Sequence, residues 1–268
     1  MVNEKIMLWP DDKFSSTSVA DEVFKPYMET FLLEGNDVRD VIIICPGGAY
    51  AGRAKHEAEP IAIKFNELGF HCIVLHYRVA PCCWPAPQED ALRAIKIVRS
   101  NAQNWHINPD KIAILGFSAG GHLACSTGII FDELEVMAGD SADSFSARPD
   151  AMILCYPVIS GVNMPNRGSL LNLLGKECLP QELAEYSWEL RVKKSTPPSF
   201  IWHTAEDLAV PVENSLNFAA ALRSHNIPFE LHIFPHGRHG LGLGVDNTIP
   251  EIQIWPELCA RWLSDLKC

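Results

Sequence analysis

The residues best able to do chemistry lie at 116–120, where the sequence reads Gly-Phe-Ser-Ala-Gly. A β-branched and aliphatic run precedes them and a segment able to form a helix follows, so the serine would stand on a sharp turn between a strand and a helix. Such a turn leaves no room for a Cβ two positions before or after the serine, which accounts for the two glycines. The pattern predicts that Ser118 is a nucleophile. The alternative is an ordinary glycine-rich strand-to-helix turn.

A nucleophilic serine needs a base to take its proton and a carboxylate to orient that base. The chain order serine, acid, histidine is typical of folds that present the serine on such a turn. Asp207, in a loop after a strand, is the favoured acid, and its neighbour Glu206 is the competitor. His239, in a glycine-flanked loop after the last strand, is the favoured base, and His236 is its rival.

A second loop of small residues, Pro-Gly-Gly-Ala-Tyr at 46–50, follows a run of β-branched residues expected to form a buried strand. Small residues in this place let the backbone point N–H groups into a cavity; the alternative is a loop that merely needs flexibility. We expect the N–H groups of Gly48, Ala49 and Ala119 to stabilise the oxyanion of an acyl-transfer reaction.

Strands alternate with helices along most of the chain, which predicts right-handed crossovers and an α/β fold with a mostly parallel twisted sheet and helices on both faces. Two short strands, near 5–9 and 27–33, are expected as antiparallel edge strands. The further strands are predicted at 41–45, 70–77, around 112, 151–158, 199–204 and 229–234, and the helices at 56–68, 87–101, after 118, 213–224 and 255–266. Residues 1–268 are expected to form one domain.

The alternation breaks between 159 and 198, where only short helices at 170–174 and 182–190 are expected. An insertion at the carboxyl edge of the sheet is well placed to wall a site, so it is predicted to be a small lid. Tyr50, Met164 and Trp188 are the candidate substrate-binding residues; for Met164 and Trp188 the alternative is packing of the insertion onto the body.

Composition narrows the class of protein. Of 268 residues, 47% are hydrophobic and 21% are charged, and the net charge of −11 argues against nucleic acid or an anionic membrane as partner. No signal-like segment opens the sequence as given, so a cytoplasmic protein is expected unless a signal was trimmed. The nine cysteines are scattered along the sequence, which favours reduced thiols over disulfides. No set of Cys and His residues has the spacing of a zinc site. The expected chemistry requires neither a metal nor a cofactor. A homodimer is possible, and exposed aromatic residues in the last helix would be its sign.

Several motifs together resemble the α/β-hydrolase esterases related to acetyl xylan and feruloyl esterases, close to the hormone-sensitive-lipase-like group. They are residues 46–50, Tyr-Arg at 77–78, Asn-Pro-Asp-Lys-Ile-Ala at 108–113, 116–124, Asp207 with Val-Pro at 210–211, and His-Gly-Arg-His-Gly at 236–240. The resemblance implies a triad of Ser118, Asp207 and His239, and an oxyanion hole built by 47–49. The chain departs from the lipase-type His-Gly-Gly-Gly loop, because Pro46 replaces the histidine and Ala49 the last glycine.

The residues themselves predict a serine hydrolase that works through an acyl-enzyme. The resemblance further implies a small-molecule or oligosaccharide ester as substrate, with removal of acetyl groups from xylan-derived oligosaccharides. Three alternatives stay open: a general short-chain carboxylesterase, an arylformamidase-like amidase, and a non-enzymatic binding protein on the same fold. Competent residues at all three triad positions argue against the last of these.

Overall fold

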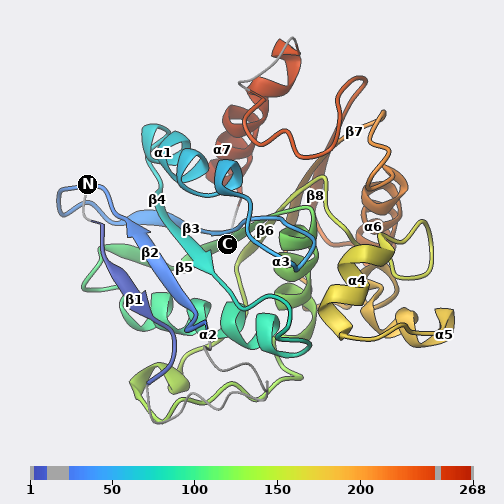
Figure 1. The fold of residues 1–268 in the computed structure, drawn as a ribbon. Helices are drawn as coiled ribbons and strands as arrows, with labels where there is room; N and C mark the ends of the chain where they lie inside the picture. Colours follow the sequence, from blue (N-terminus) through green and yellow to red (C-terminus); the bar gives the residue numbers. More distant parts are fainter. Residues whose placement is uncertain (1–2, 11–23, 245–248, 267–268) are drawn as a thin grey trace.

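A twisted sheet of eight strands crosses the computed structural model, which describes residues 3–10, 24–244 and 249–266 (Figure 1). The strands are β1 (Lys5–Met7), β2 (Tyr27–Phe31), β3 (Arg39–Cys45), β4 (His71–His76), β5 (Ile107–Phe117), β6 (Ala151–Cys155), β7 (Ser199–Thr204) and β8 (Phe229–Phe234). Their order in the sheet is β1-β2-β4-β3-β5-β6-β7-β8. β2 pairs antiparallel with β1 and β4, and the pairs from β4 to β8 are parallel. The α/β class and the antiparallel edge strands are therefore confirmed.

Helices cover both faces of the sheet, as predicted (Figure 1). They are α1 (Glu59–Glu67), α2 (Ala86–Ser100), α3 (Ala119–Ile130), α4 (Arg167–Leu174), α5 (Pro180–Leu183), α6 (Glu213–Ser224) and α7 (Trp255–Asp265). Successive side chains of a strand point to opposite faces, so β3 sends Ile43 into the core shared with α2, α3 and α6. Its neighbours Ile42 and Ile44 enter a second core with α1 and α7. The sheet thus separates two apolar cores, and its central strands β3, β6 and β7 are largely buried on both sides.

Two predicted helices are interrupted in the structure. The helix expected at 56–68 is a 3₁₀ turn, Lys55–Glu57, followed by α1, because Ala58 leaves the helical region of φ and ψ. The helix expected at 182–190 is α5 followed by two 3₁₀ turns, Ala184–Tyr186 and Trp188–Leu190. There the Ser187 hydroxyl bonds to Leu183 and Gly161, so tertiary hydrogen bonds override local helix propensity.

The insertion at 159–198 is joined to the body through the side chain of Asn214 in α6. The Asn214 Oδ1 accepts the N–H groups of Ile159 and Ser160, and its amide nitrogen donates to the carbonyl of Met164. The insertion follows β6 directly, so it lies at the carboxyl end of the parallel strands. This edge is where loops of a parallel sheet form ligand sites.

Both tryptophans of α7, Trp255 and Trp262, are buried in the second core. The last helix therefore does not present its tryptophans as the exposed aromatic sign of a dimer. Among the described residues, no helix combines the length and the apolar character needed to cross a membrane.

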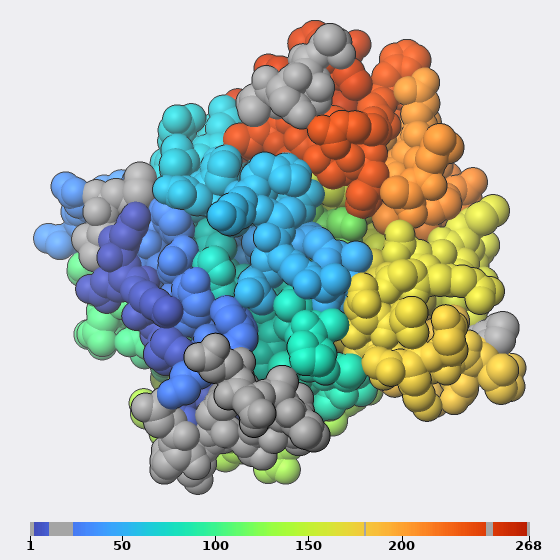
Figure 2. Space-filling view, in the orientation of Figure 1, coloured from blue at the N-terminus to red at the C-terminus, as the bar shows by residue number. Residues whose placement is uncertain are grey.

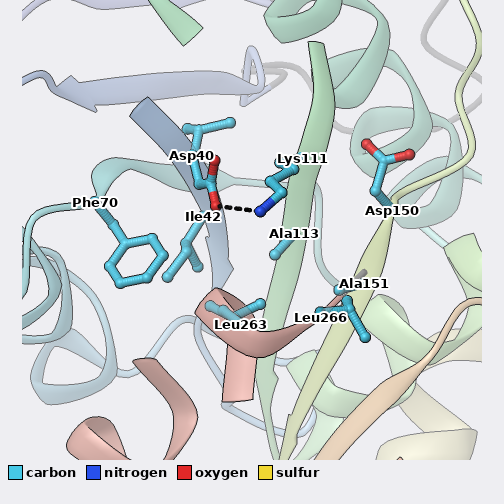
Figure 3. Close-up of a pocket in the computed structure, with 10 residues that line it drawn as sticks. Asp40, Ile42, Phe70, Lys111, Ala113, Asp150, Ala151, Leu263 and Leu266 are labelled. Atoms are coloured by element: carbon cyan, nitrogen blue, oxygen red, sulfur yellow. Dashed lines mark ion pairs between the residues drawn. The ribbon is translucent and has the colours of Figure 1, made fainter. Parts of the chain in front are cut away.

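A cavity lies at the amino ends of β3 and β6 and beside the middle of β5, under the end of α7 (Figure 3). Its walls include Ile42, Phe70 and Leu263, and an ion pair of 3.6 Å between Lys111 Nζ and Asp40 Oδ2 lies beside it. In parallel α/β sheets the functional loops gather at the carboxyl ends of the strands. This cavity is at the opposite edge, so the predicted site residues do not line it.

Candidate active site

Ser118 stands on a strained turn between β5 and α3. Its φ of 53° and ψ of −120° lie where only glycine is at ease, so the surrounding structure must hold this conformation. A Cβ on Gly116 would lie 2.0 Å from the carbonyl oxygen of Gly120, and one on Gly120 would lie 2.1 Å from that of Cys45. The steric reason given for the two glycines is therefore confirmed.

The structure brings Ser118, His239 and Asp207 into one hydrogen-bonded series. The Ser118 Oγ lies 2.7 Å from His239 Nε2, and His239 Nδ1 lies 2.6 Å from Asp207 Oδ2. With the Asp207 carboxylate as an acceptor, Nδ1 carries the imidazole proton and Nε2 is free to accept from the serine. The series joins the carboxyl ends of β5, β7 and β8, which are far apart in the sequence.

The Asp207 carboxylate is fully buried and held by its own loop. Its Oδ1 accepts the N–H groups of Ala209 and Val210, each at 2.9 Å. Burial acts to raise the pKa of Asp207, but hydrogen bonds from His203 and His239 outweigh it, so the pKa lies well below its ordinary value. A carboxylate that is charged at neutral pH can therefore fix the imidazole and stabilise an imidazolium next to it.

The competitors Glu206 and His236 form a separate pair at the surface. Glu206 Oε1 lies 3.0 Å from His236 Nδ1, and both side chains are more than half exposed. This hydrogen bond raises the pKa of His236 and lowers the pKa of Glu206. Because they bond to each other, neither joins the series that contains Ser118.

The loop at 46–50 has every carbonyl engaged with the body of the protein. Each of these five carbonyl oxygens accepts at least one hydrogen bond. The carbonyl of Pro46 accepts from the Tyr77 hydroxyl, that of Gly47 from the N–H of Ala54, and that of Gly48 from the N–H groups of Ala51 and Gly52. The carbonyl of Ala49 accepts from Asn172 Nδ2, and that of Tyr50 from the N–H of Ala80. Gly48, Ala49 and Tyr50 all have positive φ. The peptide planes of this strained loop are thus fixed one by one.

The same loop leaves backbone donors free beside the serine. Within the described part of the chain, the N–H groups of Gly48, Ala49 and Ala119 have no acceptor. A Cβ on Gly47 would lie 3.0 Å from the Cβ of Ser118, so the loop packs directly against the strained turn. Unpaired N–H groups at such a place can stabilise an oxyanion formed on a carbonyl bound to the serine.

The three candidate substrate residues have different environments. Tyr50 is 1% exposed and its hydroxyl donates to His122 Nδ1, while Trp188 is fully buried against Trp84 and His122. Their burial argues against the prediction that they line an open pocket, because both support the loop and the insertion from inside. Met164 is 52% exposed and lies on a groove with Val162 and Leu208.

Two further buried side chains, His203 and His122, support the site, although neither is a candidate site residue in the sequence analysis. His203 is fully buried, accepts from Ser215 Oγ and donates to the carbonyl of Val210, which steadies the Asp207 loop. Burial lowers the pKa of His122 to about 4, so this neutral ring can accept from Tyr50 and donate to the carbonyl of Tyr186. The only feature of the sequence that could have pointed to His203 is its position four residues before Asp207.

The surface around the site is hollowed. In Figure 2 the blue surface of the loop after β3, the yellow surface of the insertion and the red surface of the segment after β8 surround a depression in which green atoms are visible. These colours correspond to segments distant in sequence, so the depression forms only when the chain is folded.

The BD-FAE family profile matches residues 31–222. The chain is 38% identical over 244 residues to Endo-1,4-beta-xylanase B of Butyrivibrio fibrisolvens, which covers 90% of this chain and 38% of that protein. It is 33% identical over 242 residues to an acetylxylan esterase of Xylanibacter ruminicola, covering 86% of this chain and 48% of the relative. The chain thus spans less than half the length of these curated relatives.

The fold and sequence are also similar to a solved structure, that of an acetyl ester-xyloside bifunctional hydrolase from Caldicellulosiruptor lactoaceticus. The TM-score is 0.91 and the identity 43%, over 97% of this chain and 95% of that one. The chain therefore belongs to the BD-FAE family, and its fold is that of the α/β-hydrolases.

Proposed function

We propose that this protein hydrolyses carboxylic esters through a catalytic triad of Ser118, His239 and Asp207. The observation that carries the proposal is the continuous series of hydrogen bonds from Ser118 Oγ to Asp207 Oδ2, formed on a strained turn. The free N–H groups of Gly48, Ala49 and Ala119 supply the oxyanion hole. Electrostatic stabilisation of this kind is usually the largest single contribution to catalysis.

The reaction proceeds by two acyl transfers. Ser118 Oγ bonds to the ester carbonyl carbon while its proton moves to His239 Nε2, and the carbonyl electron pair becomes an oxyanion facing the free N–H groups. The tetrahedral intermediate collapses, the C–O bond to the alcohol breaks, and Nε2 returns the proton to the leaving oxygen. Water then attacks the acyl-enzyme by the same route and releases the acid. Asp207 holds the Nδ1–H throughout and is not protonated.

The proposed substrates are acetylated xylo-oligosaccharides. Support comes from the relative named acetylxylan esterase and from the structural neighbour named acetyl ester-xyloside bifunctional hydrolase. The name of the xylanase relative carries less weight, because this chain aligns with only 38% of it. A general short-chain carboxylesterase would use the same triad and differ in the pocket.

We further propose that the insertion at 159–198 acts as a small lid that walls the site. Asn172 in α4 donates to the carbonyl of Ala49, at 2.9 Å, and the carbonyl of Tyr186 accepts from His122. The insertion is therefore attached both to the oxyanion loop and to the helix that follows the serine. The groove beside Met164 would receive part of the alcohol portion of the substrate.

Initial rates on p-nitrophenyl esters from acetate to octanoate test the chemistry, with acetylated xylo-oligosaccharide and methyl ferulate assayed beside them. We expect acetate to be fastest and the oligosaccharide to release acetate. Faster hydrolysis of longer chains, with the sugars untouched, would support the general carboxylesterase.

Ser118→Ala should lower kcat on p-nitrophenyl acetate by about 10⁴-fold or more, because the nucleophile is lost. Its melting temperature should stay close to that of the wild type. Comparable activity in the variant would refute the triad, and a wild type with no activity on any ester would favour a binding protein on the hydrolase fold.

A further inference from the structure

A buried carboxylate, Glu57, lies behind the oxyanion loop. It ends the 3₁₀ turn Lys55–Glu57, and its side chain is 3% exposed. Glu57 Oε2 accepts the N–H of Gly47 at 2.8 Å, and Glu57 Oε1 accepts the hydroxyl of Tyr156 at 2.6 Å. Both oxygens therefore face groups that belong to the surroundings of the proposed active site.

The second partner, Tyr156, continues the connection to the histidine loop. Its hydroxyl accepts the N–H of Gly242 at 2.8 Å while it donates to Glu57. The ring packs edge-on against the imidazole of His239, with ring centroids 5.1 Å apart. Tyr156 follows β6 directly and has a φ of 35°, a strained conformation that brings its side chain under the site.

The first partner, Gly47, is gripped on both of its peptide groups by the same turn. Its N–H donates to Glu57, and its carbonyl accepts the N–H of Ala54 at 2.9 Å. Gly47 itself leaves no room for a Cβ against Ser118. A rotation of this peptide would therefore move the next N–H, that of Gly48, relative to the nucleophile.

The environment of Glu57 is unusual for a carboxylate that only stabilises the fold. Removing a carboxylate from water is costly, and buried examples are normally compensated by Arg or Lys. Asp90 follows this rule, because it pairs with Arg78 and accepts from Trp9. Glu57 has no Lys or Arg within ion-pair distance in the described ranges; only His56 lies near, at 3.6 Å.

We propose that Glu57 is a positioning residue for acyl transfer, because it ties the oxyanion loop at Gly47 to the His239 loop through the Tyr156 hydroxyl. The inference rests on the proposed function. It names the group that holds the oxyanion loop and the His239 loop in fixed positions relative to each other. Nucleophile, oxyanion donors and base must be placed to within a fraction of an ångström, and a small misplacement costs much of the rate.

The test is a kinetic comparison of Glu57→Gln with the wild type on p-nitrophenyl acetate. The variant keeps the size of the side chain but turns one acceptor into a donor, so the Gly47 N–H or the Tyr156 hydroxyl loses its partner. We expect kcat to fall by about 10- to 100-fold, less than the loss of an oxyanion donor itself, with KM within about threefold. Affinity for a methyl trifluoromethyl ketone, which forms a tetrahedral adduct with the serine, should fall in parallel.

Tyr156→Phe is the second variant and removes a single hydroxyl while leaving Glu57 in place. It should lower kcat in the same manner but less, and the double variant should lose less than the product of the two single losses, because the residues act as one connection. This variant decides the matter if Glu57→Gln does not fold.

Asp90→Asn is the matched control, since it also neutralises a buried, hydrogen-bonded carboxylate. We expect it to lower the melting temperature and leave kcat within twofold of the wild type. Unchanged kcat and adduct affinity in both Glu57→Gln and Tyr156→Phe, or an equal loss of kcat in the Asp90 control, would overturn the positioning role. A wild type inactive on every ester would instead refute the proposed function, and the inference with it.

Discussion

Two acid and histidine pairs lie on the same two loops, after β7 and β8, and they consist of similar groups at similar distances. Asp207 and His239 are 2.6 Å apart, and Glu206 and His236 are 3.0 Å apart. The first carboxylate is fully buried and held by two backbone N–H groups, whereas the second is 59% exposed. The comparison teaches that a hydrogen bond between an acid and a histidine is not enough to suit a pair to the proposed catalysis. Burial of the acid and contact of the histidine with Ser118 distinguish the two.

The largest difference is expected between the two histidines. His239→Ala removes the base that touches Ser118 Oγ, so kcat on p-nitrophenyl acetate should fall by about 10⁴-fold or more. His236→Ala removes a surface side chain, and its kcat should stay within twofold of the wild type. The reverse ranking in initial-rate measurements would move the base three residues upstream.

Substitution of Asp207 should lower kcat more than substitution of Glu206, and the difference should be smaller than that between the two histidines. Asp207→Asn reverses the hydrogen bond that fixes the imidazole proton on Nδ1, so kcat should fall by about 10³- to 10⁴-fold. Because the pKa of Asp207 is lowered, this carboxylate stays charged throughout the range above about pH 4, the ordinary pKa of an aspartate, and should not cause any loss of activity there.

Glu206→Gln is the control for the acids, and its kcat should equal that of the wild type. A large loss in this control, together with a mild effect of Asp207→Asn, would show that the exposed pair does the chemistry. Steady-state rates between pH 5 and pH 8 decide between the two acids.

The smallest effect is expected on stability, from the exposed pair. The raised pKa of His236 favours the folded state below about pH 6.5 and loses that benefit as the pH rises through the folded value. The lowered pKa of Glu206 favours it above about pH 4.3 and loses that benefit as the pH falls through the folded value. Glu206→Gln should therefore lower the melting temperature slightly near pH 5.5, less at pH 8, and not at about 1 M salt. A decrease that persists in high salt would contradict this screened surface interaction.

The strand-to-helix turn at Ser118 could be predicted from the sequence because its constraint is local. Two glycines at fixed spacing from a serine express a steric requirement that the backbone contacts of Gly116 and Gly120 confirm. The parallel sheet could also be predicted from the sequence, since runs of β-branched residues alternate with helical segments. Between Asp207 and Glu206 the sequence offered only a preference, because their burial depends on how the loop is folded.

The parts that escaped prediction depend on contacts between distant segments. Glu57 and Tyr156 are 99 residues apart, and nothing near either one in the sequence points to the other. Tyr50 and Trp188 looked suitable for a pocket, but both meet His122 in the interior. The helix expected at 182–190 failed for the same reason, because Ser187 bonds to Gly161 across the insertion.

The hydrogen bond from Asn172 to the carbonyl of Ala49 bears on how the proposed activity of this protein could be re-engineered. Replacing the insertion with that of another esterase would be the obvious way to change substrate range. Such an exchange would also remove the Asn172 side chain, which donates a hydrogen bond to the loop at 46–50. The turnover rate and the substrate preference would therefore change together. A chimera that keeps an amide at position 172 is the design that could separate the two.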